Sequence, residues 1–389
     1  MSIEARGQND QDPGKWTVFF YILAQSARFP VNNKERLPGN SPGRPGNRGC
    51  RIFFAWTETF ATPSRGRIME TIKNPEKTFW QDIVRASPVA TFFHTDAWTE
   101  VMAEAFQLED ITCGFVFSDN TRAVLPLLAK KTRFNAAYTR CRSMVPGVYG
   151  GVISEKTLTE SRHREIEAYL LSRKLTDLVV TGNPLDPNPF FSDRFRKTDK
   201  FTHILDLSAG FEPVFAGYSP KARRRSKSGL KKGLEIRPAR TPQDIQDYYE
   251  TYRDSLRRWG DAATRHYAFS LFENLFSKSR SGADLRLWLA TLKNKIIGGV
   301  LVLYCNRHAV EWHAAFLREH AALSPNNTLR TEIIRDACRR GIERYDFNPS
   351  SNLAGVIKFK ESFGAKKVFF TQEKWKNRKL FYRLLKNIS

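Results

Sequence analysis

The chain is poor in residues that build metal sites or disulfide networks. It has five cysteines in 389 residues, widely spaced, and no Cys-x-x-Cys pair. No histidine pair at ligand spacing accompanies them, so we expect neither a metal cofactor nor a disulfide framework. An odd number of cysteines in mostly apolar surroundings predicts buried free thiols in a reducing compartment. The cysteines are Cys50, Cys113, Cys141, Cys305 and Cys338.

Long hydrophobic runs and nucleotide-binding motifs are also missing. The longest apolar run near the start, residues 17–24, is too short to cross a bilayer and lacks the basic leader of a signal peptide. The sequence contains no P-loop, no Gly-x-Gly-x-x-Gly and no Gly-x-Ser-x-Gly. We therefore expect a cytoplasmic protein that is neither a P-loop enzyme nor a dinucleotide-binding one, with peripheral contact to the inner membrane face left open.

Acidic residues are in the minority. The chain has 63 Lys and Arg against 40 Asp and Glu, a net charge of +23. Basic residues are densest over residues 221–240 and 358–389. Such an excess predicts anionic partners: an anionic acyl donor, tRNA, or an anionic membrane surface. A basic surface that is simply solvated is the alternative.

The first 70 residues differ from the rest. Turn formers fill residues 37–49, and no helix or strand period survives there, so we expect disorder. A hypothesis follows that Met69 is the natural start and that the preceding segment is a mis-called extension. Mass spectrometry of the native protein tests this, because peptides from residues 1–60 would refute it.

From residue 91 onward, hydrophobic periods predict alternating helices and strands in an α+β fold with mixed sheets. Each half runs helix, hairpin, strand, helix, strand, which argues for two related domains rather than one large sheet. We expect domains at 71–205 and 206–375 and a basic tail at 376–389. The predicted helices cover 95–106, 157–174, 241–259, 267–277, 328–340 and 355–363, and a helix is permitted at 219–232. The predicted strands cover 111–117, 122–130, 138–145, 149–153, 177–181, 201–207, 234–239, 285–292, 296–305, 309–316, 343–347 and 367–372.

The strongest candidate site follows the strand 343–347. That strand ends at Asp346, a polar loop with Ser350 follows, and a short helix presents Phe359 and Lys360. An acid, a polar loop and a held cation at the end of a sheet suit an anionic substrate or a developing oxyanion. For Asp346 the structural alternative is an Asx turn.

A second candidate pair lies on the strand 309–316. With a period of two, Glu311 and His313 share one face and could take a proton from an amine. Trp312, on the other face, is a candidate substrate contact. A purely structural polar pair is the alternative.

Two loops are weaker candidates. Ser324, Asn326 and Asn327 open a helix whose first N–H groups could hold the phosphate of a cofactor, although plain capping explains them equally well. Around Tyr149, the pair Gly150 and Gly151 lets the backbone approach a substrate closely, unless it simply forms a turn.

Several short motifs follow one another along the chain in an order that resembles a known family. They are Phe92-Phe93-His94-Thr95-Asp96-Ala97-Trp98, Leu125-Pro126-Leu127, Tyr149-Gly150-Gly151, Ser219-Pro220-Lys221-Ala222-Arg223, Gly298-Gly299, Ser324-Pro325-Asn326-Asn327, Tyr345-Asp346-Phe347 and Phe359-Lys360-x-x-Phe363-Gly364. This order resembles the FemAB-like branch of the GNAT acyltransferase superfamily, which includes peptidoglycan-bridge transferases and the CelD/BcsL-like proteins of exopolysaccharide loci. The resemblance covers about residues 92–375.

The resemblance implies two tandem GNAT-like domains with a cleft between them. It implies that Lys360, in the Phe-Lys-x-x-Phe-Gly motif, binds substrate and stabilises charge. Asp346 corresponds to the aspartate of an Asp-Phe-Gly-like motif, with Asn348 in place of the glycine. Residues 324–327 stand where GNAT proteins usually have a glycine-rich pyrophosphate loop.

We therefore expect an N-acyltransferase that uses acyl-CoA and acts on a primary amine of a cell-envelope or exopolysaccharide precursor. The amine would attack the acyl carbonyl directly while Lys360 and backbone N–H groups stabilise the oxyanion. One alternative is an aminoacyl-tRNA-dependent peptidoglycan-bridge transferase. Another is a non-catalytic GNAT-fold binding module of a polysaccharide assembly.

Overall fold

The computed structural model describes residues 69–131, 138–186, 191–260, 266–278, 285–350, 353–378 and 380. The expectations for residues 1–68, including disorder and a mis-called extension, lie outside this range, as does most of the basic tail at 376–389. Within the described residues, no helix combines the length and the apolar character that a membrane span requires.

The strands form two sheets. The smaller sheet has the antiparallel order β1-β3-β4-β7, and an 11-stranded mixed sheet has the order β10-β11-β12-β13-β14-β9-β15-β8-β6-β5-β2. The strands are β1 (Met69–Lys73), β2 (Glu109–Asp110), β3 (Cys113–Phe117), β4 (Arg122–Leu125), β5 (Leu128–Lys131), β6 (Tyr138–Arg142), β7 (Ile153–Ser154), β8 (Asp177–Thr181), β9 (Arg196–Asp206), β10 (Glu235–Pro238), β11 (Leu285–Leu292), β12 (Lys295–Cys305), β13 (His308–Phe316), β14 (Arg344–Asp346) and β15 (Lys366–Lys376).

Helices cover these sheets, and their starts follow the capping signals in the sequence. Thr95 accepts a hydrogen bond from the Trp98 N–H at the start of α2, and Thr241 forms a capping box with Asp244 at the start of α6. The helices are α1 (Lys77–Ala86), α2 (Asp96–Ala105), α3 (Glu160–Ser172), α4 (Phe211–Ala216), α5 (Pro220–Lys231), α6 (Pro242–Trp259), α7 (Phe269–Lys278), α8 (Pro325–Arg339) and α9 (Ala354–Glu361), with 3-10 turns η2 (Phe92–His94) and η4 (Arg318–Leu323).

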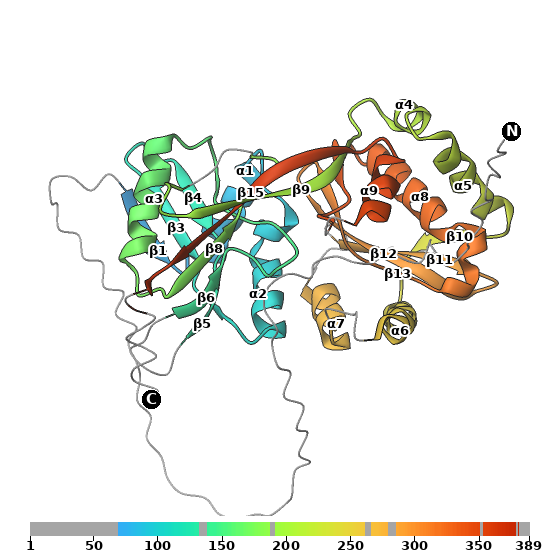
Figure 1. Ribbon diagram of the computed structural model, residues 1–389, viewed down its shortest axis with the longest axis horizontal. Coiled ribbons are helices and arrows are strands. Elements are labelled where there is room, and N and C mark those ends of the chain that lie inside the picture. The colour runs from blue at the N-terminus through green and yellow to red at the C-terminus, as the bar shows by residue number, and fades with distance from the viewer. Residues whose placement is uncertain are drawn as a thin grey trace, which may run out of the picture. The chain divides into compact units, whose positions relative to one another are not determined.

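Strands β9 and β15 join the two parts of the chain, which correspond to the expected domains at 71–205 and 206–375 (Figure 1). They pair with each other from Lys366 opposite Ile204 to Lys374 opposite Arg196. At one end β9 also pairs with β14, and at the other end β15 pairs with β8. The large sheet is therefore continuous, and the expectation that one large sheet is absent was wrong. The segments 196–200 and 373–376 are mostly charged and lack an apolar alternation, so the sequence does not predict them as strands. Their backbones pair nevertheless.

Aromatic side chains from both parts pack into one hydrophobic cluster. The ring centroids of Trp98, on α2, and Trp312, on β13, are 5.3 Å apart. Tyr149 lies 5.0 Å from Phe93 and 5.9 Å from Phe370 on β15. Because all five side chains are nearly inaccessible to solvent, the region between the two parts is packed at these positions.

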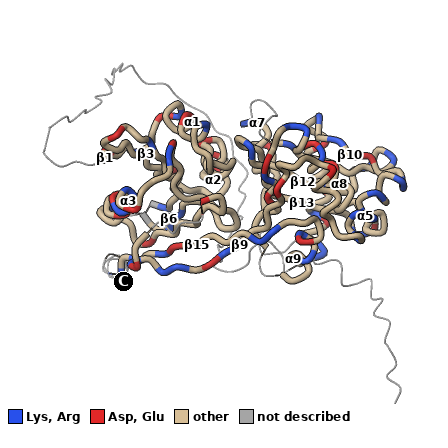
Figure 2. Tube along the Cα trace, turned by 90° about the horizontal axis from the view of Figure 1, so that it is seen from above, with Lys and Arg blue, Asp and Glu red and all other residues tan. Residues whose placement is uncertain are grey.

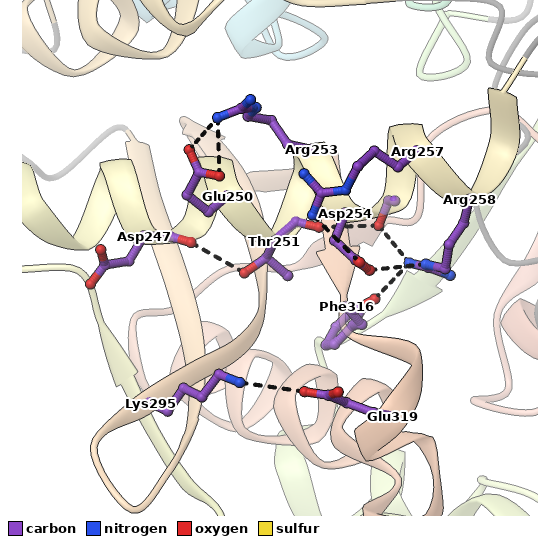
Figure 3. A network of polar contacts seen from close by, with 11 residues as sticks. Asp247, Glu250, Thr251, Arg253, Asp254, Arg257, Arg258, Lys295, Phe316 and Glu319 are labelled. Atoms are coloured by element: carbon purple, nitrogen blue, oxygen red, sulfur yellow. Dashed lines mark hydrogen bonds and ion pairs between the residues drawn. The ribbon is translucent and has the colours of Figure 1, made fainter.

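Helix α6 is hydrogen-bonded to the end of β13 (Figure 3). Arg258 pairs with Asp254 at 2.9 Å and donates to the Phe316 carbonyl oxygen at 3.1 Å. Nearby, Arg253 and Glu250 form an exposed pair within the helix. Of these contacts, only the hydrogen bond from Arg258 to Phe316 connects α6 to the sheet. It helps to hold the end of β13.

Candidate active site

Asp346 lies at the end of β14, fully buried, in a set of hydrogen bonds that spans the two parts of the chain. Its carboxylate accepts from the Thr202 hydroxyl at 2.5 Å, from the Tyr149 hydroxyl at 2.9 Å and from the Asn348 N–H at 2.7 Å. The last bond is the Asx turn expected as the structural alternative. Burial raises the pKa of Asp346 to about 6, although these hydrogen bonds oppose the rise.

Lys360 is also buried, as expected for a held cation, whereas Lys358 on the same helix is exposed. The Lys360 ammonium donates to the Asn348 carbonyl oxygen at 2.5 Å. Burial lowers the pKa of Lys360 to about 7, against the opposing influence of Glu311 and Asp346. The side chain can therefore exist as an amine or as an ammonium near neutral pH, inside a packed region.

The lowered pKa of Lys360 predicts a specific pH dependence of stability. Between the folded-state pKa of about 7 and the ordinary lysine pKa of 10.5, the unfolded chain binds more protons at this group. Stability contributed by Lys360 therefore rises with pH across that window, by at most about 1.4 kcal/mol per pH unit. Urea unfolding at pH 7.5 to 10 should show wild type gaining stability relative to Lys360→Met.

The matched control for that measurement is Lys358→Met. Because Lys358 is exposed on the same helix, its difference from wild type should stay flat over the window. A flat difference for Lys360→Met as well would show that Lys360 keeps an ordinary pKa in the folded protein.

A buried ion pair lies beside Lys360. The Arg330 guanidinium, on α8, donates to both Glu311 oxygens, at 2.7 to 3.0 Å, and the Tyr345 hydroxyl donates to Glu311 at 2.7 Å. Arg330 also donates to the Asn326 side-chain oxygen. The two ions are 5 to 6% exposed. Glu311 is thus held as the partner of a cation, and we do not propose it as a base.

The expected pairing of Glu311 with His313 was wrong because β13 contains a β-bulge. Leu301 pairs with His313 and Val302 with Glu311, so Trp312 is an extra residue in the strand. Trp312 and His313 consequently both face α6 and α7, where the His313 ring lies 2.6 Å from the Tyr248 hydroxyl. Burial lowers the pKa of His313 to about 3, so the imidazole is neutral.

Trp312, expected to contact substrate from the face opposite Glu311 and His313, is instead beside His313. Its ring packs against Trp98, Tyr267 and Phe272, and the side chain is 6% exposed. These contacts account for its position as part of the core. A substrate contact from Trp312 has no support in these contacts, and we do not propose one.

The parallel strand β14 pairs over its whole length, but only with the beginning of β13. The ladder runs from His308 opposite Arg344 to Val310 opposite Asp346, where β14 ends while β13 continues to Phe316. Among the described strands, none pairs with β13 beyond Val310 on that side. An extended ligand with amide groups could pair with the backbone of β13 just beyond Val310, where no described strand lies beside it.

The loop expected to hold a cofactor phosphate lies at the start of α8. Ser324 has a positive φ of 55° and caps the helix with its backbone, without a side-chain capping bond. Asn326 is bound to Arg330, and Asn327 is buried. Phosphate binding by these three residues stays a prediction.

The loop at Tyr149 brings one predicted residue to the site. The Tyr149 hydroxyl bonds to Asp346, whereas Gly150 is close-packed against Ser143, whose carbonyl oxygen would be 3.0 Å from an added Cβ. Gly151 has a φ of +103°. Of the expected strand at 149–153, only Ile153 lies in a strand, β7 (Ile153–Ser154). A close approach of substrate to Gly150 and Gly151 stays a prediction.

The loop after β14 contains unsatisfied polar groups. The Ser350 hydroxyl and the Asn348 side-chain oxygen are buried and lack a hydrogen-bond partner within the described part of the chain. Asn348 has a φ of 61°, a left-handed conformation that glycine adopts freely and asparagine tolerates. This explains how Asn348 can stand where the Asp-Phe-Gly-like motif of the resembling family has glycine. Phe359 packs on Phe363 beside Arg330.

Sequence reasoning missed three residues of this site: His308, Thr202 and Arg330. His308 Nε2 lies 3.4 Å from the Tyr149 hydroxyl and 3.9 Å from Asp346, and burial lowers its pKa to about 3. All three contact the site through tertiary packing, and no local pattern marks His308 or Thr202. Arg330 alone had a signal, because it lies four residues after Asn326 on a helix.

No group of three or more His, Cys, Asp or Glu side chains that could hold a metal ion occurs in the portion of the chain that the structure describes. The candidate site contains two carboxylates, a guanidinium, a buried lysine and the hydroxyls of Tyr149 and Tyr345.

Comparisons with known proteins agree with this architecture. Residues 207–361 match the family described as Acetyltransferase (GNAT) domain. No curated protein matches the chain. Among solved structures, FemX superposes with a TM-score of 0.62, with 13% identity over 81% of this chain and 99% of that chain.

Two further structures show the same fold. One is the C-terminal domain of a putative lysylphosphatidylglycerol synthetase from Agrobacterium fabrum, with a TM-score of 0.52 and 12% identity over 79% of this chain and 93% of that chain. The other is a conserved protein of unknown function from Bacteroides thetaiotaomicron, with a TM-score of 0.50 and 11% identity over 78% and 99%. The predicted fold class, mixed α+β with tandem GNAT-like halves, is confirmed.

Proposed function

Starting from a chain that has the FemAB-like GNAT fold and a matched acetyltransferase domain, we propose that the protein is an N-acyltransferase whose reaction takes place beside Lys360. The observation that carries the proposal is the position of this lysine. Its buried ammonium group contacts the loop directly after β14, beside buried Asp346, where β13 and β14 stop pairing.

The reaction would be a direct transfer. The nitrogen of a primary amine attacks the carbonyl carbon of an acyl thioester, a C–N bond forms, and the C–S bond breaks. The amine gives up a proton to water, and the leaving thiolate takes one, so the products are an amide and a thiol. Protonated Lys360 would donate to the carbonyl oxygen as negative charge develops there.

The part of β13 just beyond Val310 would hold the acyl donor. Beyond Val310 its backbone groups face the region after the end of β14. The amides of an extended pantetheine arm could pair with them, and the phosphates could lie at the start of α8 near Asn326. Acyl-CoA is therefore the donor that this geometry supports best, and the amine of an envelope or polysaccharide precursor is the acceptor we propose.

A binding measurement tests the donor. Acetyl-CoA and longer acyl-CoA esters should stabilise the protein against thermal unfolding, by about 2.7 kcal/mol at a concentration 100 times the dissociation constant. Free CoA, which lacks the acyl group, serves as the matched ligand. Stabilisation by aminoacyl-tRNA without any stabilisation by CoA esters would contradict acyl-CoA as the donor.

One observation favours an aminoacyl-tRNA donor as the second candidate. Helix α5 contains no acidic residue and exposes Lys221, Arg224, Lys227 and Lys231. RNA phosphates could pair with these side chains, and binding would then weaken steeply as salt rises.

A further inference from the structure

Helix α5 packs on α8 through small side chains. Its buried residues are Ala222, Ser226 and Gly229, and the Ser226 hydroxyl bonds to the Thr331 hydroxyl of α8 at 2.7 Å. The two helices lie side by side in Figure 1. Because a helix buries only one stripe of its surface, the other side of α5 is turned away from the core.

The outer side of α5 is basic. The helix has six Lys and Arg and no acidic residue. Figure 2 shows Lys and Arg, in blue, along α5. In the described part of the chain, no ion pair joins Arg224, Lys227 or Lys231 to an acid. These exposed charges therefore suit an extended anionic surface.

An exposed leucine lies among these cations. Leu230 is 46% exposed, and within the described residues only Phe106 and Phe369 are further examples of exposed large hydrophobic side chains. At about 100° per residue, Arg223, Lys227 and Leu230 lie within about 60° of one another on the helix. A leucine adds nothing to phosphate binding, whereas its transfer out of water is favourable. Its exposure therefore points to a partner with an apolar layer.

Two phenylalanines of α4 lie beside this surface. Phe211 and Phe215 are partly exposed, and their stacked rings have centroids 5.5 Å apart. The Lys227 ammonium lies 5.4 Å from the centroid of Phe215, and the Arg335 guanidinium lies 3.9 Å from that of Phe211. Cations next to exposed leucine and phenylalanine are typical of helices that lie in the interface of an anionic membrane.

Nucleic acid fits this surface less well than lipid. Bases of single-stranded nucleic acid stack on open aromatic faces. The rings of Phe211 and Phe215 stack on each other instead, and a cation lies over each of them. Leu230 would stay in water beside RNA phosphates, whereas a bilayer would cover it.

We propose that α4 and α5 dock the protein on a bilayer that contains anionic phospholipids. Arg224, Lys227 and Lys231 would bind the headgroups, and Leu230 would enter the layer between headgroups and acyl chains, with Phe215 beside it. We call these five residues the docking face. The proposal does not rest on acyl transfer, and it assigns the cations of α5 to lipid instead of RNA.

Sedimentation of the full-length protein with vesicles tests the docking face. Vesicles of phosphatidylglycerol and phosphatidylcholine in equal parts should bind at least tenfold more tightly than vesicles of phosphatidylcholine alone. Lys227→Gln with Lys231→Gln should weaken binding to the anionic vesicles at least tenfold. Leu230→Gln, which keeps the net charge, should weaken it at least threefold.

Each variant has a matched control. Lys156→Gln with Lys174→Gln removes the same charge from exposed positions in the first half of the chain, and it should change binding less than twofold. Phe106→Gln removes an exposed apolar side chain from the end of α2, with the same expectation. Unchanged melting temperatures would show that the variants fold.

Three results would overturn the proposal. Equal weakening by the two lysine pairs would indicate a general effect of net charge. Full binding by Leu230→Gln would indicate adsorption by charge alone, without entry of α5 into the bilayer. Saturable tRNA binding that Lys227→Gln with Lys231→Gln weakens, without binding to vesicles, would assign the face to RNA. None of these readouts uses acyl transfer, so failure of the proposed reaction would be recognised separately.

Discussion

Replacing Lys360 with methionine should slow acyl transfer by a factor of about 10² to 10³ and leave the fold intact. Removing one donor from an oxyanion site typically costs about 2.7–4 kcal/mol of transition-state stabilisation. Methionine fills a similar volume, and its uncharged side chain avoids the burial of a charge, so the 4% exposed site should accept it. Steady-state rates with the acyl-CoA ester that stabilises the protein best provide the measurement.

The control for the Lys360 variant is Lys358→Met on the same helix. Lys358 is exposed, so its variant should keep the wild-type rate within about twofold. Circular dichroism and the melting temperature show whether either variant has lost structure. Wild-type turnover by a folded Lys360→Met protein would remove Lys360 from the mechanism.

Replacing Glu311 with leucine should destabilise the protein by about 3–5 kcal/mol. The change leaves the buried Arg330 guanidinium without its carboxylate partner, and an uncompensated buried charge is costly. The Tyr345 hydroxyl also loses its acceptor. The midpoint of urea unfolding should therefore fall sharply.

A double variant separates charge from packing at this pair. Glu311→Leu with Arg330→Met removes both ions, and it should regain most of the stability that Glu311→Leu loses. The matched surface control is Arg253→Ala, whose exposed partner Glu250 appears in Figure 3. That change should cost less than about 1 kcal/mol. An equal loss in the single and double variants would mean that packing, not charge, governs the site.

Local signals in the sequence predicted many elements of the fold. The strand at 177–181 matches β8 in full, and Thr95 and Thr241, the first residues of the predicted helices 95–106 and 241–259, cap α2 and α6. Pro126 divides the expected strand at 122–130 into β4 and β5, because proline lacks the N–H that a ladder requires. Apolar periodicity and capping are local properties, which is why these features are readable.

The bulge at Trp312 and the full length of β9 were not predictable in this way. Period-two reasoning assigns faces correctly only when no residue is inserted, and the sequence of β13 does not mark the insertion. In β9 the segment before Phe201 is mostly charged, so its pairing depends on β15, about 170 residues away in the chain.

The candidate site was predicted in part. The position of Lys360 next to the partly buried Phe359 and of Asp346 at a strand end follows from local spacing, and the side chains of Lys360 and Asp346 are both buried. The link from Asp346 to Tyr149, Thr202 and His308 joins distant segments of the chain. Such contacts are set by the tertiary fold and leave no local trace.

The position of β15 has a consequence for biosynthesis. This strand lies between β8 and β9, yet the ribosome makes it long after both of them. At about 5–20 residues per second, β8 waits on the order of ten seconds or more for its neighbour. During that interval the edges of β8 and β9 that β15 later covers are open to pairing with other strands.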